Sequence, residues 1–101
     1  MVERTIRFGE HPAVPVIGQG TWYMGENPAL RAQEAAALRA GIDLGLTVID
    51  TAEMYADGGA EEVVGEAIRG QRDRVVLVPK VYPWNAGGRK IARACEASLR
   101  R

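Results

Sequence analysis

Three polar side chains follow two apolar segments of the sequence, and a carboxylate, a phenol and an amine in one place could deliver a proton. Asp50 and Tyr55 follow Thr47-Val48-Ile49, and Lys80 follows Val75-Val76-Leu77-Val78. A phenol is a poor acid at neutral pH because its free pKa is about 10, and a neighbouring ammonium favours the phenolate. A carboxylate would hold that ammonium charged and oriented. Such a group could protonate a carbonyl oxygen while a hydride arrives at the carbonyl carbon.

The elements that must position these residues alternate along the chain between apolar strands and amphipathic helices. Asn27-Pro28 is a favourable helix start, and Gly45 and Gly70 are natural stops after the first two helices. This alternation predicts right-handed βαβ units and a parallel sheet. The predicted elements are a hairpin over residues 5–16, strands that begin at residues 16, 46 and 75, and helices over residues 27–43, 60–69 and 89–101.

The predicted core comes from the apolar faces of these elements. The strand over residues 75–78 is uniformly β-branched or leucine, which predicts burial on both of its faces. In the first helix, the residues expected to share the buried face are Leu30, Ala37, Leu38, Gly41 and Ile42. In the second helix, they are Val63, Val64, Ala67 and Ile68.

Unusual residues gather where the predicted parallel strands end, which is where parallel α/β folds form their sites. They are Gly20-Thr21-Trp22, Asp50 with Tyr55, and Lys80 followed by Tyr82 and Trp84. Taken singly, each has a plainer interpretation: Asp50 caps a turn, Lys80 is a surface charge and Tyr55 is a packing residue. Their convergence on neighbouring strand ends favours a site.

Composition and motifs argue against several other classes of function. Thirteen basic and thirteen acidic residues balance, so neither nucleic acid nor a membrane surface is an expected partner. No apolar run approaches the length of a membrane span, and the lone Cys95 fits a reducing cytoplasm. His11 and Cys95 cannot make a typical zinc site. Gly18-Gln19-Gly20 is not a dinucleotide fingerprint, because Tyr23 stands where the third glycine belongs.

At four stretches the sequence resembles the aldo-keto reductases. They are residues 15–22 (Pro-Val-Ile-Gly-Gln-Gly-Thr-Trp), 50–55 (Asp-Thr-Ala-Glu-Met-Tyr), 61–68 (Glu-Glu-Val-Val-Gly-Glu-Ala-Ile) and 78–81 (Val-Pro-Lys-Val). The resemblance implies reduction of aldehydes and ketones with NADPH, or with NADH as the alternative, and without a metal. The predicted fold class is α/β: a partial (β/α)8 TIM barrel with an N-terminal β-hairpin followed by three parallel βα units. Residues 1–101 would be a single incomplete domain.

The resemblance also assigns roles to individual residues. Tyr55 would be the proton donor, Lys80 the residue that tunes it, and Asp50 the partner of Lys80. The residues matched to the edge of the cofactor site are Gly20, Thr21, Trp22 and Asp50. The residues matched to the wall of the substrate pocket are Trp22, Met54 and Trp84. The expected partner is therefore a small carbonyl substrate.

The sequence departs from the family pattern in two residues and in length. Ala56 replaces a frequent glycine, and Pro79 replaces the usual Ser or Thr and removes a backbone N–H beside Lys80. The family's catalytic histidine belongs to a strand beyond these 101 residues, as do the segments that hold the adenosine phosphate, and His11 in the hairpin cannot substitute. We therefore expect the 101 residues alone to be inactive. An uncovered sheet face and an apolar edge strand predict that the isolated chain self-associates.

Three hypotheses about function remain open from the sequence. The first is the N-terminal part of an NADPH-dependent aldo-keto reductase that acts on small carbonyls. The second is a short or degraded copy that keeps the motifs but acts, if at all, through association. The third, an unrelated barrel or open α/β binding domain, leaves the motifs unexplained. The sequence favours the first and does not name the substrate.

Overall fold

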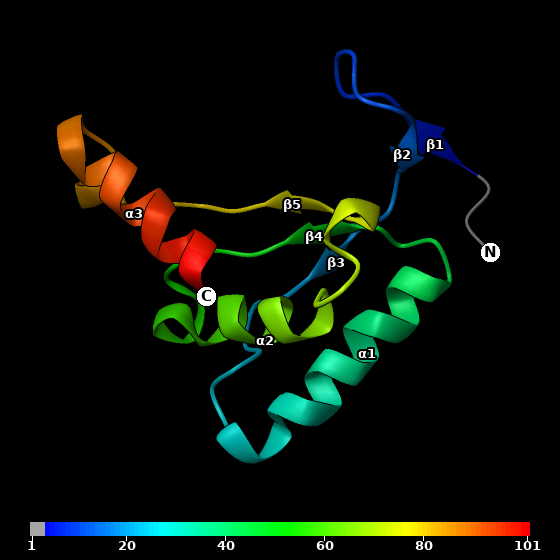
Figure 1. Cartoon of the computed structure of the whole chain (residues 1–101), viewed down its shortest axis with the longest axis horizontal. Coiled ribbons are helices and arrows are strands. Elements are labelled where there is room, and N and C mark those ends of the chain that lie inside the picture. The colour runs from blue at the N-terminus through cyan, green and yellow to red at the C-terminus, as the bar shows by residue number, and fades with distance from the viewer. Residues whose placement is uncertain (1–3) are drawn as a thin grey trace.

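Three short parallel strands form the sheet that carries the polar residues. In the computed structural model, which describes residues 4–101, β4 (Val48–Asp50) lies between β3 (Gln19–Gly20) and β5 (Val76–Val78). Both pairings are parallel, so the carboxyl ends of the three strands meet at one edge (Figure 1). The parallel sheet predicted from the sequence is confirmed, although each strand is short. Residues 1–3 of the predicted domain lie outside the described part of the chain.

The pairing of β4 with β5 continues past the ends of both strands. Asp50 is the register partner of Val78. Beyond this pair, the Thr51 N–H donates to the Val78 carbonyl at 3.0 Å, and the Glu53 N–H donates to the Lys80 carbonyl at 3.1 Å. These two hydrogen bonds keep the segments that follow β4 and β5 side by side, and the candidate catalytic residues lie on those segments.

A small antiparallel hairpin precedes the sheet. It pairs β1 (Thr5–Ile6) with β2 (Val14–Pro15), and both arms are shorter than the sequence predicts. Pro15 cannot donate a backbone hydrogen bond, which agrees with its place in a strand that has one partner among the described residues. The hairpin stands at one side of the molecule, away from α2 and α3 (Figure 1).

The first helix begins where the sequence predicts. Asn27 caps it, because its side-chain oxygen accepts a hydrogen bond from the Ala29 N–H at 3.0 Å. A 3-10 turn over Pro28–Leu30 leads into α1 (Arg31–Asp43). Gly45 then adopts a φ of +98°, a conformation that favours glycine, and redirects the chain into β4.

The buried face of α1 differs in part from the predicted one. Its buried residues are Ala35, Leu38, Gly41 and Ile42. Leu30 is 43% exposed and Ala37 is exposed, so these two assignments are wrong. Ala35 takes their place because it lies three residues before Leu38 and seven before Ile42, on the same side of the helix.

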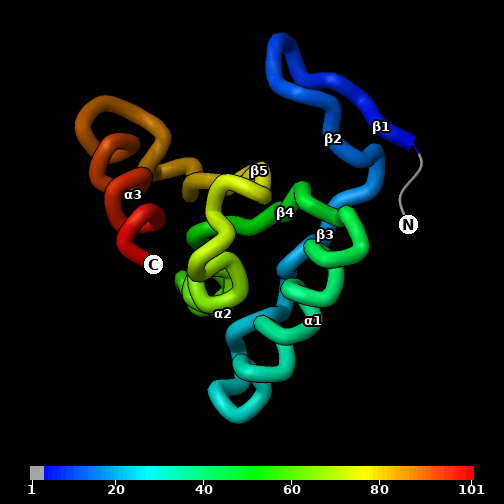
Figure 2. Tube along the Cα trace, turned by 45° about the vertical axis from the view of Figure 1, so that its right-hand side comes forward, coloured from blue at the N-terminus to red at the C-terminus, as the bar shows by residue number. Residues whose placement is uncertain are grey.

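A single apolar core joins α1 and α2 (Gly59–Ala67) to the sheet. The two helices pack against each other, and Figure 2 shows both beneath the strands. The buried members of this core are Ala35, Leu38, Ile42, Ile49, Val63, Val64, Ala67, Ile68 and Val75. The four apolar residues predicted to face the core from the second helix are all among them.

The last strand is less buried than the sequence predicts. Val75 is buried, but Val76 and Leu77 are half-buried and Val78 is 41% exposed. The expectation of burial on both faces is therefore wrong for the described residues. The reason is that β5 forms an edge of the described sheet, while α1 and α2 pack on one face of it.

The third helix is attached loosely to the rest of the fold. A 3-10 turn over Pro83–Asn85 leads into α3 (Gly88–Arg100), close to the predicted bounds. Ala94 is its one buried residue, and Leu99 is 77% exposed. The C-terminal end lies beside α2 (Figure 1), where the Arg101 guanidinium meets the buried Glu61 carboxylate at 2.7 Å.

Candidate active site

The structure brings together the three side chains that the sequence singles out for proton delivery. The Lys80 ammonium nitrogen lies 2.7 Å from Asp50 Oδ1 and 3.0 Å from the Tyr55 hydroxyl oxygen. Its third hydrogen bond goes to the Thr51 carbonyl at 3.2 Å. An ammonium has three hydrogens, so these three acceptors use all of them. Lys80 is thus held by the end of β4 from one side and by the tyrosine from the other.

The surroundings of Lys80 keep it protonated. Burial, the largest single influence, lowers the pKa of Lys80, but hydrogen bonds to Asp50 and Tyr55 and the Asp50 carboxylate charge act against it. The net result is a pKa raised above the ordinary value of 10.5. Lys80 is therefore a cation throughout the physiological pH range, and it donates hydrogen bonds without accepting any.

Tyr55 opens an unusual turn. The 3-10 segment Tyr55–Gly58 contains two consecutive residues with left-handed backbone, Ala56 at a φ of 52° and Asp57 at a φ of 51°. Gly58 also has a positive φ and leads directly into α2. This turn joins the segment after β4 to α2, and it begins with the tyrosine whose hydroxyl oxygen contacts Lys80.

The hydrogen of the Tyr55 hydroxyl is not used in the hydrogen bonds of residues 4–101. The Tyr55 oxygen accepts from Lys80 at 3.0 Å, and Lys80 as a cation can only donate. The phenol's own hydrogen is therefore free to donate to another acceptor. The site can in this way offer one proton to an incoming oxygen atom.

Two aromatic stacks form in the segments that follow the three parallel strands, and one of them contains Tyr55. The Trp22 ring lies 6.4 Å from the Tyr55 ring and 4.9 Å from the Tyr23 ring, centroid to centroid. Trp84 instead stacks on Tyr82 at 4.3 Å. Trp22 and Trp84 are 67% and 66% exposed, so both present open faces to solvent. Of the predicted substrate-wall residues, Trp22 is in direct reach of the phenol.

The other predicted site residues differ in their exposure. Gly20 borders open space, with nothing within 4 Å of the position that a Cβ would take. Thr21 is fully buried, and its hydroxyl donates to the Asp50 carbonyl at 2.9 Å, so this side chain ties β3 to β4. Met54 is half-buried beside Tyr55 in the sequence. Cofactor and substrate contacts at these residues stay predictions.

Comparison with known proteins places the chain in a family. The model of the aldo/keto reductase family matches residues 16–101. The chain belongs to the aldo/keto reductase family. Methylglyoxal reductase YeaE of Escherichia coli is 66% identical over 101 residues, which are 100% of this chain and 36% of that protein. Aldo-keto reductase YhdN of Bacillus subtilis is 38% identical over 98 residues, covering 84% of this chain and 30% of that protein.

Solved aldo/keto reductases share the fold of this chain. A Klebsiella pneumoniae enzyme in complex with NADP and acetate is 77% identical, with a TM-score of 0.93 over 98% of this chain and 35% of that one. The thermostable reductase Tm1743 is 31% identical, with a TM-score of 0.89 over 97% of this chain and 38% of that one. The chain thus spans about a third of the length of these relatives. The predicted fold class, a partial (β/α)8 barrel, is confirmed.

Sequence reasoning missed the role of Glu53 in this reductase-family site. Glu53 is 7% exposed, and its Oε1 accepts hydrogen bonds from the Tyr82 N–H at 2.6 Å and from the Asn85 side chain at 3.1 Å. The Glu53 backbone also holds the Lys80 carbonyl. The available signal was an acidic residue between Ala52 and Met54, directly after a buried strand.

Pro79 proves compatible with the strand that carries Lys80. The Val76 N–H donates to the Thr47 carbonyl, and the Val78 and Lys80 carbonyls accept hydrogen bonds from the β4 side. The backbone N–H and C=O groups of the even-numbered residues therefore point toward β4. Pro79 therefore faces the outer edge of β5, where its missing N–H costs no bond to β4. The departure from the family pattern noted at this position leaves the Lys80 geometry intact.

A hollow of about 630 Å³ between α2, β5 and α3 adjoins the site, because Thr51, Glu53 and Lys80 are among its lining residues, which are mainly apolar. Asp50, Tyr55 and Trp22 do not border it. Residues 4–101 contain no cluster of His, Cys, Asp and Glu side chains suited to a metal ion. Within the same range, no helix has the length and apolar character that a membrane crossing requires.

Proposed function

We propose that Asp50, Tyr55 and Lys80 form the proton-delivery group of an NADPH-dependent reductase of small aldehydes and ketones. The observation that supports this most is that Lys80 uses its three hydrogens on Asp50, Thr51 and Tyr55. The Tyr55 hydroxyl keeps its own hydrogen for a substrate oxygen. Asp50 keeps the ammonium charged and fixed, and Lys80 stabilises the negative charge that develops on the phenol oxygen as its proton leaves.

The residues at the edge of the sheet fit one end of a nicotinamide cofactor. Gly20 leaves open space beside Asp50, whose side chain is 44% exposed, and the exposed Trp22 ring stands next to them. NADPH, or NADH as the alternative, would supply a hydride to the carbonyl carbon when bound. Two solved relatives were crystallised with NADP or NADPH, which supports this cofactor class.

Methylglyoxal is the first substrate to test. The relative that is 66% identical over the whole of this chain is named a methylglyoxal reductase. Trp22 offers an aromatic wall beside the Tyr55 ring, and pockets for small molecules commonly combine such a wall with a few polar groups.

A hybrid enzyme tests the roles of these residues directly. Residues 1–101 would replace the matching part of the Klebsiella pneumoniae reductase, which is 77% identical. We expect NADPH-dependent reduction of methylglyoxal, and we expect Tyr55→Phe to lower kcat roughly 100-fold or more, the range of general acid catalysis. Tyr23→Phe removes a hydroxyl from the neighbouring stacked ring and should leave kcat unchanged. A Tyr55→Phe hybrid with full activity would refute the assignment of the proton donor.

We further propose that the 101 residues by themselves do not reduce carbonyls. This proposal rests on the expectation, from the family pattern, that the catalytic histidine and the phosphate-holding segments are not among residues 1–101. Fluorescence titration with NADPH should show binding to the hybrid and none to the 101-residue chain. Tight binding by the 101-residue chain would overturn this proposal. A folded, NADPH-binding hybrid without activity would favour the alternative, a non-catalytic copy that acts by association.

We also propose that the isolated chain self-associates and that the protein works in the cytoplasm. Val78 is 41% exposed on β5, an edge of the described sheet, and an apolar edge strand pairs readily with another chain. Sedimentation velocity should show species larger than a monomer, and Val78→Lys should reduce them. A monomer at all concentrations would contradict the proposal.

The single exposed Cys95 supports a reducing compartment, which fractionation of the native cells would test.

A further inference from the structure

We propose that Arg31 and Glu34 of α1 are positioning residues that hold Trp22 against the Tyr55 ring. They act through the backbone of Gly25, in the loop that follows β3. The consequence for substrate recognition rests on the function proposed above. The positioning itself is independent of that function.

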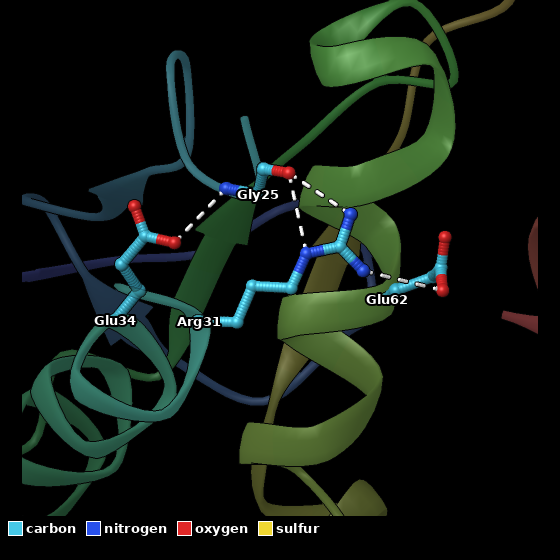
Figure 3. A network of polar contacts seen from close by, with 4 residues as sticks. All are labelled: Gly25, Arg31, Glu34 and Glu62. Atoms are coloured by element: carbon cyan, nitrogen blue, oxygen red, sulfur yellow. Dashed lines mark hydrogen bonds and ion pairs between the residues drawn. The ribbon is translucent and has the colours of Figure 1, made fainter. Parts of the chain in front are cut away.

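Both polar backbone groups of Gly25 are held by side chains of one helix. The Gly25 N–H donates to Glu34 Oε1 at 3.0 Å, and the Gly25 carbonyl accepts from Arg31 Nε at 3.2 Å and Nη2 at 2.9 Å (Figure 3). Hydrogen bonds to charged groups are stronger than those between neutral groups. With its N–H and its carbonyl both fixed, this residue has little freedom to rotate, and the loop that carries Trp22 is anchored three residues away.

The same network fixes the loop against the start of α2. Arg31 Nη1 reaches Glu62 Oε2 on α2 at 3.4 Å (Figure 3). Gly25 is buried at a φ of +84°, and a Cβ there would collide with the backbone of Gly59. Gly59 is the first residue of α2 and comes four residues after Tyr55. The loop that carries Trp22 and the turn that carries Tyr55 are therefore in direct backbone contact.

Burial does not fix the Trp22 ring, so its position depends on the backbone anchors on either side of it, which are the buried Thr21 before it and Gly25 after it. The ring is 67% exposed, and its aromatic partners are Tyr23 and Tyr55. The Arg31–Glu62 ion pair is partly exposed and contributes little by itself. The Gly25 hydrogen bonds are consequently the part of the network that holds the ring in place.

The chain supplies a matched control. Arg39, also on α1, reaches the Glu66 backbone carbonyl of α2 at 3.0 Å and the Glu66 carboxylate at 3.3 Å. Like Arg31, it joins α1 to α2, but it makes no hydrogen bond to the loop that carries Trp22. Loss of Arg39 therefore reports the general effect of weakening the contact between the helices.

Two tryptophans allow the proposal to be tested without any catalytic assay. In a Trp84→Phe background, the near-ultraviolet circular dichroism and fluorescence anisotropy of the chain report Trp22; in a Trp22→Phe background, they report Trp84. We expect Glu34→Ala, which removes the acceptor of the Gly25 N–H, and Arg31→Ala to cause loss of the Trp22 signals and to leave the Trp84 signals unchanged. Arg39→Ala should change neither.

Far-ultraviolet circular dichroism would show whether Arg31→Ala unfolds the chain. If it does, a pair of conservative variants still tests the proposal. Arg31→Lys keeps a positive charge for Glu62 but loses the bidentate hydrogen bonding of the guanidinium to the Gly25 carbonyl, so the Trp22 signals should fall. Arg39→Lys should leave them intact. Unchanged Trp22 signals in folded Glu34→Ala and Arg31→Lys chains, or equal losses at Trp84, would overturn the proposal. Neither result would bear on the proton-delivery role of Tyr55, which the hybrid enzyme tests separately.

Discussion

Replacement of Ala56 by glycine should stabilise this chain, although glycine usually destabilises a fold. Ala56 directly follows Tyr55 and has left-handed backbone, with a φ of 52° and a ψ of 33°. A side chain in this conformation brings Cβ too close to a carbonyl oxygen, at a cost of roughly 1–2 kcal/mol. Glycine has no Cβ and adopts the same conformation without that cost.

Two smaller terms oppose this gain. Glycine loses more backbone freedom on folding than alanine, by about 0.5–1 kcal/mol. Ala56 is half-buried, and removal of its methyl group costs about 0.4 kcal/mol, half of the value for a fully buried carbon. With the middle of each range, the net effect of Ala56→Gly is a stabilisation of about 0.35 kcal/mol. This raises the melting temperature by about 1.4–2.8 °C for a chain of this size.

Ala36→Gly is the matched control, because Ala36 is exposed in the middle of the regular helix α1. In that setting glycine costs about 1 kcal/mol relative to alanine and should lower the melting temperature by about 4–8 °C. Both variants and the parent chain would be melted at one concentration, with circular dichroism as the signal. If Ala56→Gly loses as much stability as Ala36→Gly, the left-handed turn at Tyr55 is not strained and the reasoning fails.

Three further predictions concern the polar network. Asp50→Asn removes the carboxylate charge that helps to raise the pKa of Lys80, so the Lys80 Cε signal should titrate at lower pH in NMR, with Lys90, the other lysine, as the internal reference. An unmoved titration would disprove the coupling. The pKa of Lys80 in the folded state lies above 10.5, so the contribution of its charge to stability is present below pH 10.5 and is lost as the pH rises through the folded-state pKa. The urea midpoints of the parent chain and of Lys80→Met should therefore converge at alkaline pH. Glu53→Ala removes a charged acceptor, and the Tyr82 amide should exchange with deuterium faster, whereas unchanged protection would show that Glu53 does not hold this segment.

The sequence predicted what depends on local pattern and on strand polarity. Alternation of strands and helices was enough to infer a parallel sheet, and parallel strands bring their ends together. Asp50 and Lys80 were therefore expected to lie close, and the structure brings them within 2.7 Å. The caps at Asn27 and Gly45 follow from single-residue preferences and were predicted correctly.

What the sequence could not predict depends on contacts between distant residues. Glu53 looks like a solvent-exposed acid until the fold places Tyr82 and Asn85 against it. The left-handed φ of Ala56 was not predicted, because alanine rarely adopts it. The apolar composition of residues 75–78 predicted a strand buried on both faces. The degree of burial depends on which elements cover each face of the sheet, and the composition of the strand does not contain that information.

The Asp50–Lys80 contact also reports the alignment of two strands. Side chains along a strand alternate between its two faces, so a shift of β5 by one residue relative to β4 would turn Lys80 away from Asp50. A shift by two residues would keep the face but move Lys80 by about 6.6 Å, the rise of two strand residues, and so change its position relative to Thr51 and Tyr55 as well as Asp50. The residues proposed to handle the proton therefore also favour the correct strand pairing, and a chain misaligned by one residue would lose its chemistry together with its fold.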